Sequence, residues 1–130
     1  MKYNIILPIL PIYAEKILNG EKTYEYRKRL CVKDIKRIYL YATTPIKKIV
    51  GEVEVLEKIH IDKDKLWEQT KNESGISYDV FMMYFRDYDM ASAYRLGKAK
   101  KYKEGIDLQE IGILYHPQSY IYVGDIRRKI

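Results

Sequence analysis

The feature that most constrains the fold is an abrupt change of pattern at Asn19-Gly20. Residues 11–18 read as a helix with one buried side, and Pro11 suits its first turn. Gly20 fits the left-handed residue that commonly follows the end of a helix. Residues 22–29 then alternate and are rich in tyrosine and β-branched side chains, which is typical of a strand. The chain is therefore predicted to contain both α and β structure, with a helix leading directly into a strand.

The rest of the chain is predicted to be mainly strands, interrupted by one helical stretch. Residues 37–42 alternate between aliphatic and tyrosine side chains, the period-two pattern of a strand. A longer strand is expected over residues 48–59, with a bulge near Leu56 where the alternation changes register. Two helices are expected over about residues 62–87, the second with Ser77 as its N-cap. Other expected elements are strands at residues 3–7, 91–102 and 120–123, a short helical turn capped by Asp107, and a basic tail at residues 125–130.

Composition limits the class of protein. A chain of 130 residues suits one domain covering residues 1–130, and 47% hydrophobic with 32% charged residues is typical of a folded globular protein. No apolar run approaches the roughly 20 residues that a membrane-spanning helix needs, so no membrane partner is expected. Cys31 is the only cysteine. A single cysteine excludes an intrachain disulfide and favours the reducing cytoplasm as the location.

Positive charge is concentrated in one part of the chain. The net charge is +6, and residues 22–48 hold nine basic residues against two acidic ones, Glu25 and Asp34. The nine are Lys22, Arg27, Lys28, Arg29, Lys33, Lys36, Arg37, Lys47 and Lys48. Such a basic face, together with 14 tyrosines, favours RNA or a nucleotide as the partner, because aromatic rings stack on unpaired bases. The alternatives are a solvated rim and a surface for an acidic protein partner.

Lys22, Glu25 and Arg27 place an amine, a carboxylate and a guanidinium within six residues. Glu25 and Arg27 share one face of the predicted strand, whereas strict alternation puts Lys22 on the other face. The three groups can meet only if Lys22 lies on the turn before the strand, or at a bulge. A partly buried Lys22 could act as a base or nucleophile, and Arg27 could hold a phosphate. The alternative is a salt-bridged strand start with a structural role only.

The spacing Gly20-x-Lys22-x-x-Glu25-x-Arg27 resembles the signature of the ASCH family, which belongs to the PUA-like β-barrels. Later segments resemble the family in the same order: residues 38–45 and 50–53, Trp67, residues 75–77, Tyr84-Phe85, Ala93 and residues 117–120. The resemblance implies an α+β fold, a mainly antiparallel PUA-like β-barrel with an N-terminal helix and an inserted helical pair. It also implies that the charged triad lines a cleft at the barrel mouth, which RNA or a nucleotide enters.

The resemblance also implies an alternative activity. Some proteins of this fold are small amidohydrolases acting on N4-acetylcytidine, and others are linked to RNA cleavage. The amidohydrolases use a motif lysine, which Lys22 matches, and a threonine whose position holds Glu25 here. That catalytic set is therefore not reproduced. The alternative to a binding protein is a small hydrolase of a modified nucleoside or of RNA, with Lys22 and Glu25 as its catalytic residues.

Further polar residues are candidates for ligand binding. Gln118 and Ser119 precede the last predicted strand and suit hydrogen bonds to a base edge, while Tyr120 suits stacking on the base. The three are expected opposite the charged triad. Thr43 lies at the end of a predicted strand, and Gly20 lies beside the triad. The alternative for all of these residues is a role in turns or in the core.

Neither a metal nor a cofactor is expected. The soft ligands Cys31, His60 and His116 show none of the paired spacings of metal sites. The chain also has no phosphate-binding loop, no dinucleotide-binding motif and no nucleophile elbow.

Overall fold

The computed structural model describes residues 1–127, and residues 128–130 of the predicted basic tail lie outside the described part. The strands are β1 (Tyr3–Ile9), β2 (Tyr24–Tyr26), β3 (Ile35–Ala42), β4 (Lys48–Asp62), β5 (Met90–Ile106) and β6 (Ile121–Val123). The helices are α1 (Pro11–Leu18), α2 (Lys63–Thr70) and α3 (Tyr78–Tyr84), with the 3₁₀ helices η1 (Lys71–Glu73) and η2 (Leu108–Ile111). Within the described part of the chain, no helix is long and apolar enough to cross a bilayer.

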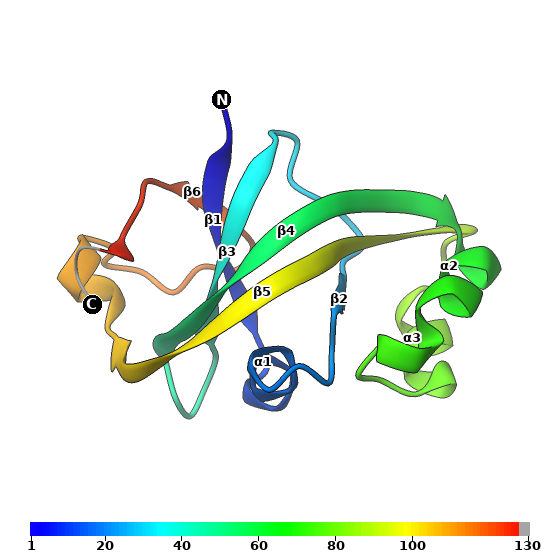
Figure 1. Cartoon of the computed structure of the whole chain (residues 1–130), viewed down its shortest axis with the longest axis horizontal. Helices are drawn as coiled ribbons and strands as arrows, with labels where there is room; N and C mark the ends of the chain where they lie inside the picture. The colour runs from blue at the N-terminus through cyan, green and yellow to red at the C-terminus, as the bar shows by residue number, and fades with distance from the viewer. Residues whose placement is uncertain (128–130) are drawn as a thin grey trace.

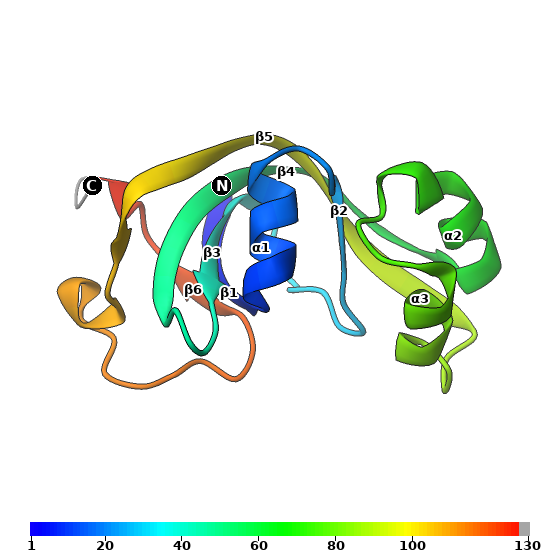
Figure 2. The same ribbon diagram turned by 90° about the horizontal axis from the view of Figure 1, so that it is seen from below.

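The six strands of residues 1–127 form one curved sheet (Figure 1). The strand order is β2-β5-β4-β3-β1-β6, and the one parallel pair among residues 1–127 is β1 with β3. Seen from below, the sheet arches over α1, which lies on its concave side (Figure 2). The predicted α+β, mainly antiparallel architecture is thus confirmed.

The sheet is open, whereas the family resemblance implied a β-barrel. β2 and β6 form its two edges, and no pairing joins them within the described residues. β6 has only three residues and pairs with β1 alone, so it extends the sheet without closing it. The PUA-like outline therefore comes from curvature around α1 and not from a continuous ring of hydrogen bonds.

Both faces of the sheet are buried along most of β3, because its residues alternate between two apolar cores. Ile38, Leu40 and Ala42 of β3 pack on the concave side with α1. Tyr39 and Tyr41 point to the opposite side and pack with η2 and the C-terminal segment. The period-two pattern read from residues 37–42 therefore describes two covered faces, with aliphatic side chains on one and tyrosines on the other.

The helix before Gly20 follows the sequence prediction, whereas the strand after it is shorter than predicted. α1 has the predicted bounds, and Gly20 takes a left-handed φ of +87° just after its end. β2 is shorter than the predicted residues 22–29, because it pairs with β5 through Tyr24, Glu25 and Tyr26 only. The residues that follow Tyr26 leave the sheet and form a loop.

The predicted helical pair stands between β4 and β5 and packs beside the sheet (Figure 1). Ser77 caps α3 as predicted, since its hydroxyl accepts a hydrogen bond from the backbone N–H of Val80 at 3.1 Å. The rings of Phe81 and Phe85 contact the Tyr26 ring of β2, with centroids 5.1 and 6.4 Å apart. This third core fixes the helical insertion next to the strand that carries the charged triad.

A second charged cluster is buried on the convex side of the sheet. The Nε atom of Arg37 lies 2.9 Å from a carboxylate oxygen of Glu52, but its N–H does not point at that oxygen. The contact is therefore an ion pair without an aligned hydrogen bond. Tyr102 donates a hydrogen bond of 2.8 Å to the other carboxylate oxygen. Burial, together with this carboxylate acceptor, raises the pKa of Tyr102 far above its usual value.

Candidate functional site

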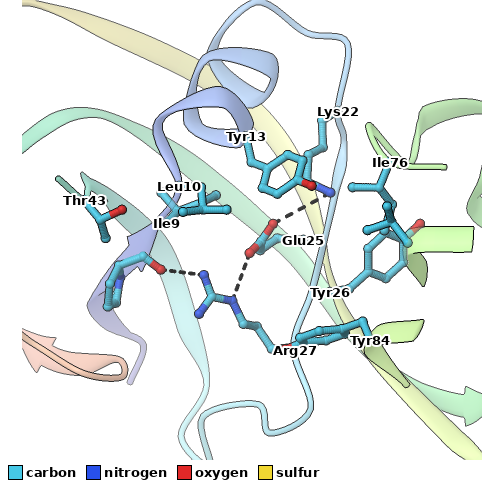
Figure 3. A pocket seen from close by; sticks show the side chains of 12 residues that line it. Ile9, Leu10, Tyr13, Lys22, Glu25, Tyr26, Arg27, Thr43, Ile76 and Tyr84 are labelled. Atoms are coloured by element: carbon cyan, nitrogen blue, oxygen red, sulfur yellow. Dashed lines mark hydrogen bonds and ion pairs between the residues drawn. The ribbon is translucent and has the colours of Figure 1, made fainter. Parts of the chain in front are cut away.

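A pocket of about 420 Å³ opens between α1, β2 and α3 (Figure 3). Its volume falls in the range of small-molecule sites, roughly 300–1,000 Å³. Lys22, Glu25 and Arg27 all line it. The other lining residues are Pro8, Ile9, Leu10, Tyr13, Tyr26, Thr43, Ile76, Val80 and Tyr84. The structure therefore brings the three charged residues of the motif together in one concave site.

Lys22 lies deepest in this site. Its side chain is 1% exposed, and its amine donates a hydrogen bond of 2.6 Å to the carbonyl of Ser74. Burial lowers the pKa of Lys22 from 10.5 to about 8; Glu25 opposes this change, while Lys16 and Arg27 add to it. An amine with this pKa exchanges its proton close to neutral pH, where a general acid or base is most effective.

Lys22 is positioned by the turn that precedes β2 and by the loop that follows η1. The backbone N–H of Lys22 donates to the carbonyl of Lys16 at 3.0 Å, and that of Thr23 donates to Glu73 at 3.0 Å. Gly75, at φ +69°, lies against the Lys22 stem, where a Cβ atom would come within 2.7 Å of three of its carbons. Lys22 thus sits outside the pleat of β2, which is the turn position that the site hypothesis required.

Glu25 joins the two cations of the triad. Its Oε1 atom lies 3.7 Å from the Lys22 amine, and its Oε2 atom accepts a hydrogen bond of 2.9 Å from Nε of Arg27. Arg27 also donates from Nη2 to the carbonyl of Pro8 in β1. The side chain of Arg27 is 24% exposed, against 8% for Glu25. Arg27 is therefore the charged group of the triad most accessible to an incoming phosphate.

Aromatic rings form much of the wall around the charged floor. The Lys22 amine lies 5.6 Å from the ring centroid of Tyr13 and 4.8 Å from that of Tyr26. Figure 3 shows the Tyr13 hydroxyl directed toward this amine. The Tyr26 ring is fixed by a hydrogen bond of 2.6 Å between its hydroxyl and Thr70, and burial raises its pKa to about 12. Flat apolar walls over a charged floor suit a nucleobase attached to a phosphate.

The other predicted ligand residues are divided between the pocket and its surroundings. Thr43 lines the pocket, whereas Gly20, Gln118, Ser119 and Tyr120 do not. Gly20 instead terminates α1. The Tyr120 ring packs edge-on against the ring of Tyr122, with centroids 5.4 Å apart. The loop before β6 therefore does not contribute to the pocket wall.

Several wall residues were missed by sequence reasoning. Tyr13 lies on α1, and Ile76 and Val80 come from the helical insertion. Tyr84, at the end of α3, also lines the pocket. These residues meet because the insertion folds back against β2, and no local pattern in the sequence signals that contact. Tyr13, on the helix just before the charged motif, is the one wall residue that its place in the sequence could have indicated.

The soft ligands are used within the fold. Cys31 is buried. A ring nitrogen of His60 shares a hydrogen bond of 2.6 Å with Ser92, and one of His116 shares a bond of 3.0 Å with Tyr41. Among residues 1–127, no three His, Cys, Asp or Glu side chains converge as they would around a metal ion.

Solved structures of similar fold come from Zymomonas mobilis. The crystal structure of ASCH from this organism matches with a TM-score of 0.88 and 26% identity, covering 98% of this chain and 92% of that chain. A tyrosine-to-phenylalanine variant of that protein matches with the same TM-score of 0.88 and 25% identity, covering 98% and 95%. No protein-family model matches the chain.

Curated relatives match by sequence over most of the chain. An ASCH domain-containing ribonuclease of Zymomonas mobilis is 29% identical over 92 residues, which are 70% of this chain and 62% of the relative. The large ribosomal subunit protein uL22 of Ureaplasma parvum is 31% identical over 121 residues, which are 92% of this chain but 39% of that protein. The chain thus spans less than two thirds of the length of these relatives.

Proposed function

Because the chain belongs to the ASCH domain family, we propose that it binds single-stranded RNA or a nucleotide, with one nucleotide in the pocket of Figure 3. The observation that carries the proposal is the buried amine of Lys22 beside Glu25 and Arg27, at the base of a pocket with aromatic walls. The ribonuclease name of the Zymomonas relative supports RNA over other anionic ligands.

The pocket offers a complementary group for each part of a nucleotide. The rings of Tyr13 and Tyr84 and the aliphatic wall suit the faces of a base, which stack on aromatic side chains. Arg27 suits the phosphate, since a guanidinium binds phosphate oxygens through paired hydrogen bonds. Glu25 suits a ribose hydroxyl as an acceptor. The net charge of +6 would attract the polyanion.

The binding test measures fluorescence anisotropy with a labelled single-stranded RNA of about ten nucleotides, a length within the site sizes of single-strand binders. Arg27→Met should weaken binding roughly tenfold or more, because a hydrogen bond to a charged group contributes about 1.5–3 kcal/mol. It should also reduce the slope of log affinity against log salt by about 0.7, the value for one phosphate contact.

The matched control is Lys36→Met, which removes one charge from an exposed position outside the pocket. It should leave both the affinity and the salt slope at their wild-type values. Equal losses from Arg27→Met and Lys36→Met would show general attraction without a site. Wild-type protein that binds neither RNA nor a mononucleotide at low salt would refute the proposal itself.

RNA cleavage is the second candidate function, favoured by the lowered pKa of Lys22 and by the name of the relative. The uncharged amine of Lys22 would accept the proton of a ribose 2′-hydroxyl, whose oxygen then attacks the adjacent phosphorus. The bond from phosphorus to the 5′-oxygen breaks, and that oxygen takes a proton from water. Arg27 would stabilise the extra negative charge on the phosphate. The products are a 2′,3′-cyclic phosphate and a 5′-hydroxyl.

The cleavage test analyses products by liquid chromatography and mass spectrometry. Because the active amine is uncharged, the rate should rise with pH and level off above about pH 8. Lys22→Met should abolish cleavage, and so should a single 2′-deoxyribose at the cleaved position. Cleavage that survives either change contradicts the proposed step. N4-acetylcytidine is tested in parallel, and acetate released by the wild type but not by Lys22→Met or Glu25→Gln would favour the amidohydrolase alternative.

A further inference from the structure

We propose that residues 27–33, the basic loop, bind further phosphates of the same single-stranded RNA as it leaves the pocket. The inference rests on the proposed function, because the loop begins at Arg27, which lines the pocket. It adds a second, extended part to the binding site. The ligand that fills both parts is a single strand of several nucleotides and not a lone nucleotide.

The backbone of the basic loop is fixed by tyrosine hydroxyls. Three of its N–H groups donate to tyrosines from three different elements. The bonds run from Lys28 to Tyr84 at 3.2 Å, from Cys31 to Tyr94 at 2.8 Å and from Lys33 to Tyr122 at 3.0 Å. Surface loops are usually mobile. Three hydrogen bonds to side chains of α3, β5 and β6 hold the backbone of this loop in one position.

One lysine side chain binds three backbone carbonyl groups of the loop. The amine of Lys58 in β4 donates to the carbonyls of Cys31, Val32 and Lys33 at 2.7, 3.3 and 3.2 Å. Its positive charge is therefore directed at the backbone, and the loop keeps a defined shape at its far end. A binding segment that is ordered before the ligand arrives loses less conformational entropy on binding.

The side chains of the loop leave their charges available. Lys28, Arg29 and Lys33 are exposed, and the loop contains no acidic residue. Within residues 1–127, no ion pair joins any of the three to a carboxylate. Three unpaired cations on a fixed backbone make a surface that is complementary to consecutive phosphates.

Tyrosine rings flank the loop at both ends. The Lys28 amine lies 4.8 Å from the ring centroid of Tyr84 and 5.8 Å from that of Tyr88. The Lys33 amine lies 4.3 Å from the ring centroid of Tyr3 and 4.9 Å from that of Tyr122. Cations beside aromatic rings are the combination by which proteins hold single strands, through phosphate contacts and base stacking. It favours unpaired RNA over a duplex, whose bases are not free to stack on side chains.

The experiment compares two triple variants that remove the same charge from different places. The test variant is Lys28→Ala/Arg29→Ala/Lys33→Ala, and the control is Lys100→Ala/Lys101→Ala/Lys103→Ala, at three exposed lysines of β5. Both are titrated with the RNA of about ten nucleotides over a range of salt, and with a cytidine monophosphate. The test variant should lower the salt slope by about 2, from three contacts at about 0.7 each. The control should not change the slope, and neither variant should change mononucleotide binding.

A charge-neutral variant separates the shape of the loop from its charge. Tyr122→Phe keeps the ring and all cations but removes the acceptor for the Lys33 N–H. It should weaken binding of the longer RNA about two- to tenfold, the effect of one hydrogen bond, without changing the salt slope. An unchanged affinity would show that the fixed backbone is irrelevant to binding.

Failure of this inference is distinguishable from failure of the proposed function. If Arg27→Met weakens RNA binding while the loop variant matches the wild type, the pocket stands and the extended site is refuted. Equal losses from the two triple variants would likewise refute it, since attraction would then be general. Duplex RNA or an acidic peptide bound as tightly as the single strand, with the same dependence on the loop, would overturn the assignment of the ligand. No binding of RNA or mononucleotide by the wild type refutes both proposals.

Discussion

Replacing the buried lysine of the pocket should make the protein more stable. Lys22 is held in an environment that disfavours its charge, and its pKa falls from 10.5 to about 8 because of burial. A methionine at this position keeps a similar length and fills the same space between Gly75 and the aromatic rings. Glu25 retains Arg27 as its partner at 2.9 Å. Lys22→Met therefore removes a destabilising charge without leaving Glu25 unpaired.

The magnitude follows from the difference between the two pKa values. A fall from 10.5 to about 8 corresponds to about 3 kcal/mol of destabilisation at pH 7. Between about pH 8 and pH 10.5, the unfolded chain still holds the proton that Lys22 has released in the folded protein. The wild-type free energy of unfolding therefore rises with pH in this range. Lys22→Met lacks this contribution. The free energy of unfolding of Lys22→Met should exceed that of the wild type by up to about 3 kcal/mol at pH 7, and this difference should shrink by about 2.5 kcal/mol at pH 10.

The assay is urea unfolding at pH 7, 8.5 and 10, followed by the fluorescence of Trp67. The difference between wild type and variant is the relevant quantity, because the other titrating groups are common to both. Lys36→Met, at an exposed lysine, controls for the change in net charge. A variant that is less stable than the wild type at pH 7, with a difference independent of pH, would show that burial of the Lys22 charge does not destabilise the fold. Lys22 would then be a cation whose charge stabilises the fold.

Two further changes test how the charged groups are supported. Gly75→Ala should destabilise by about 2–5 kcal/mol, from a left-handed backbone and a clash at 2.7 Å with the buried lysine stem. The control is Gly20→Ala, at φ +87° with no atom near its added Cβ, which should lower the free energy of unfolding by only about 1–2 kcal/mol. If urea unfolding shows equal losses for Gly75→Ala and Gly20→Ala, the clash with Lys22 is excluded. Glu52→Ala should lose about 3–5 kcal/mol by leaving Arg37 buried and unpaired. Glu57→Ala, which removes one partner of an exposed ion pair, should lower the free energy of unfolding by less than about 1 kcal/mol. A loss this small for Glu52→Ala would show that Arg37 does not depend on Glu52 as its buried partner.

Local signals predicted the elements of the fold well, whereas the open edge between β2 and β6 could not be predicted from them. Pro11 and Gly20 fix the two ends of α1 through backbone geometry alone, so its bounds could be read directly. The change of register near Leu56 corresponds to irregular pairing of β4 with β5 after Val53 and Val55. Closure depends instead on whether the edge strands reach each other. That property depends on the short β6 and on sheet curvature, and neither has a local signature.

The charged triad could be predicted from spacing, but its pocket could not. Turn geometry after Gly20 decides that Lys22 joins Glu25, and this information is contained within a few residues. The walls come from α1 and α3, and Tyr13 and Val80 reach the triad only because the insertion packs against β2. Burial, which moves the pKa of Lys22, is likewise a product of tertiary packing.

The most direct test of the central claim is carbon-13 NMR of the lysine side chains, with the Lys22 signal assigned by its absence in Lys22→Met. This signal should titrate with a midpoint near 8 in the free protein. Saturating single-stranded RNA should displace the signal and move the midpoint upward, because a nearby phosphate favours the charged amine. A midpoint near 10.5 and a signal that RNA does not displace would contradict the claim that this pocket holds a nucleotide.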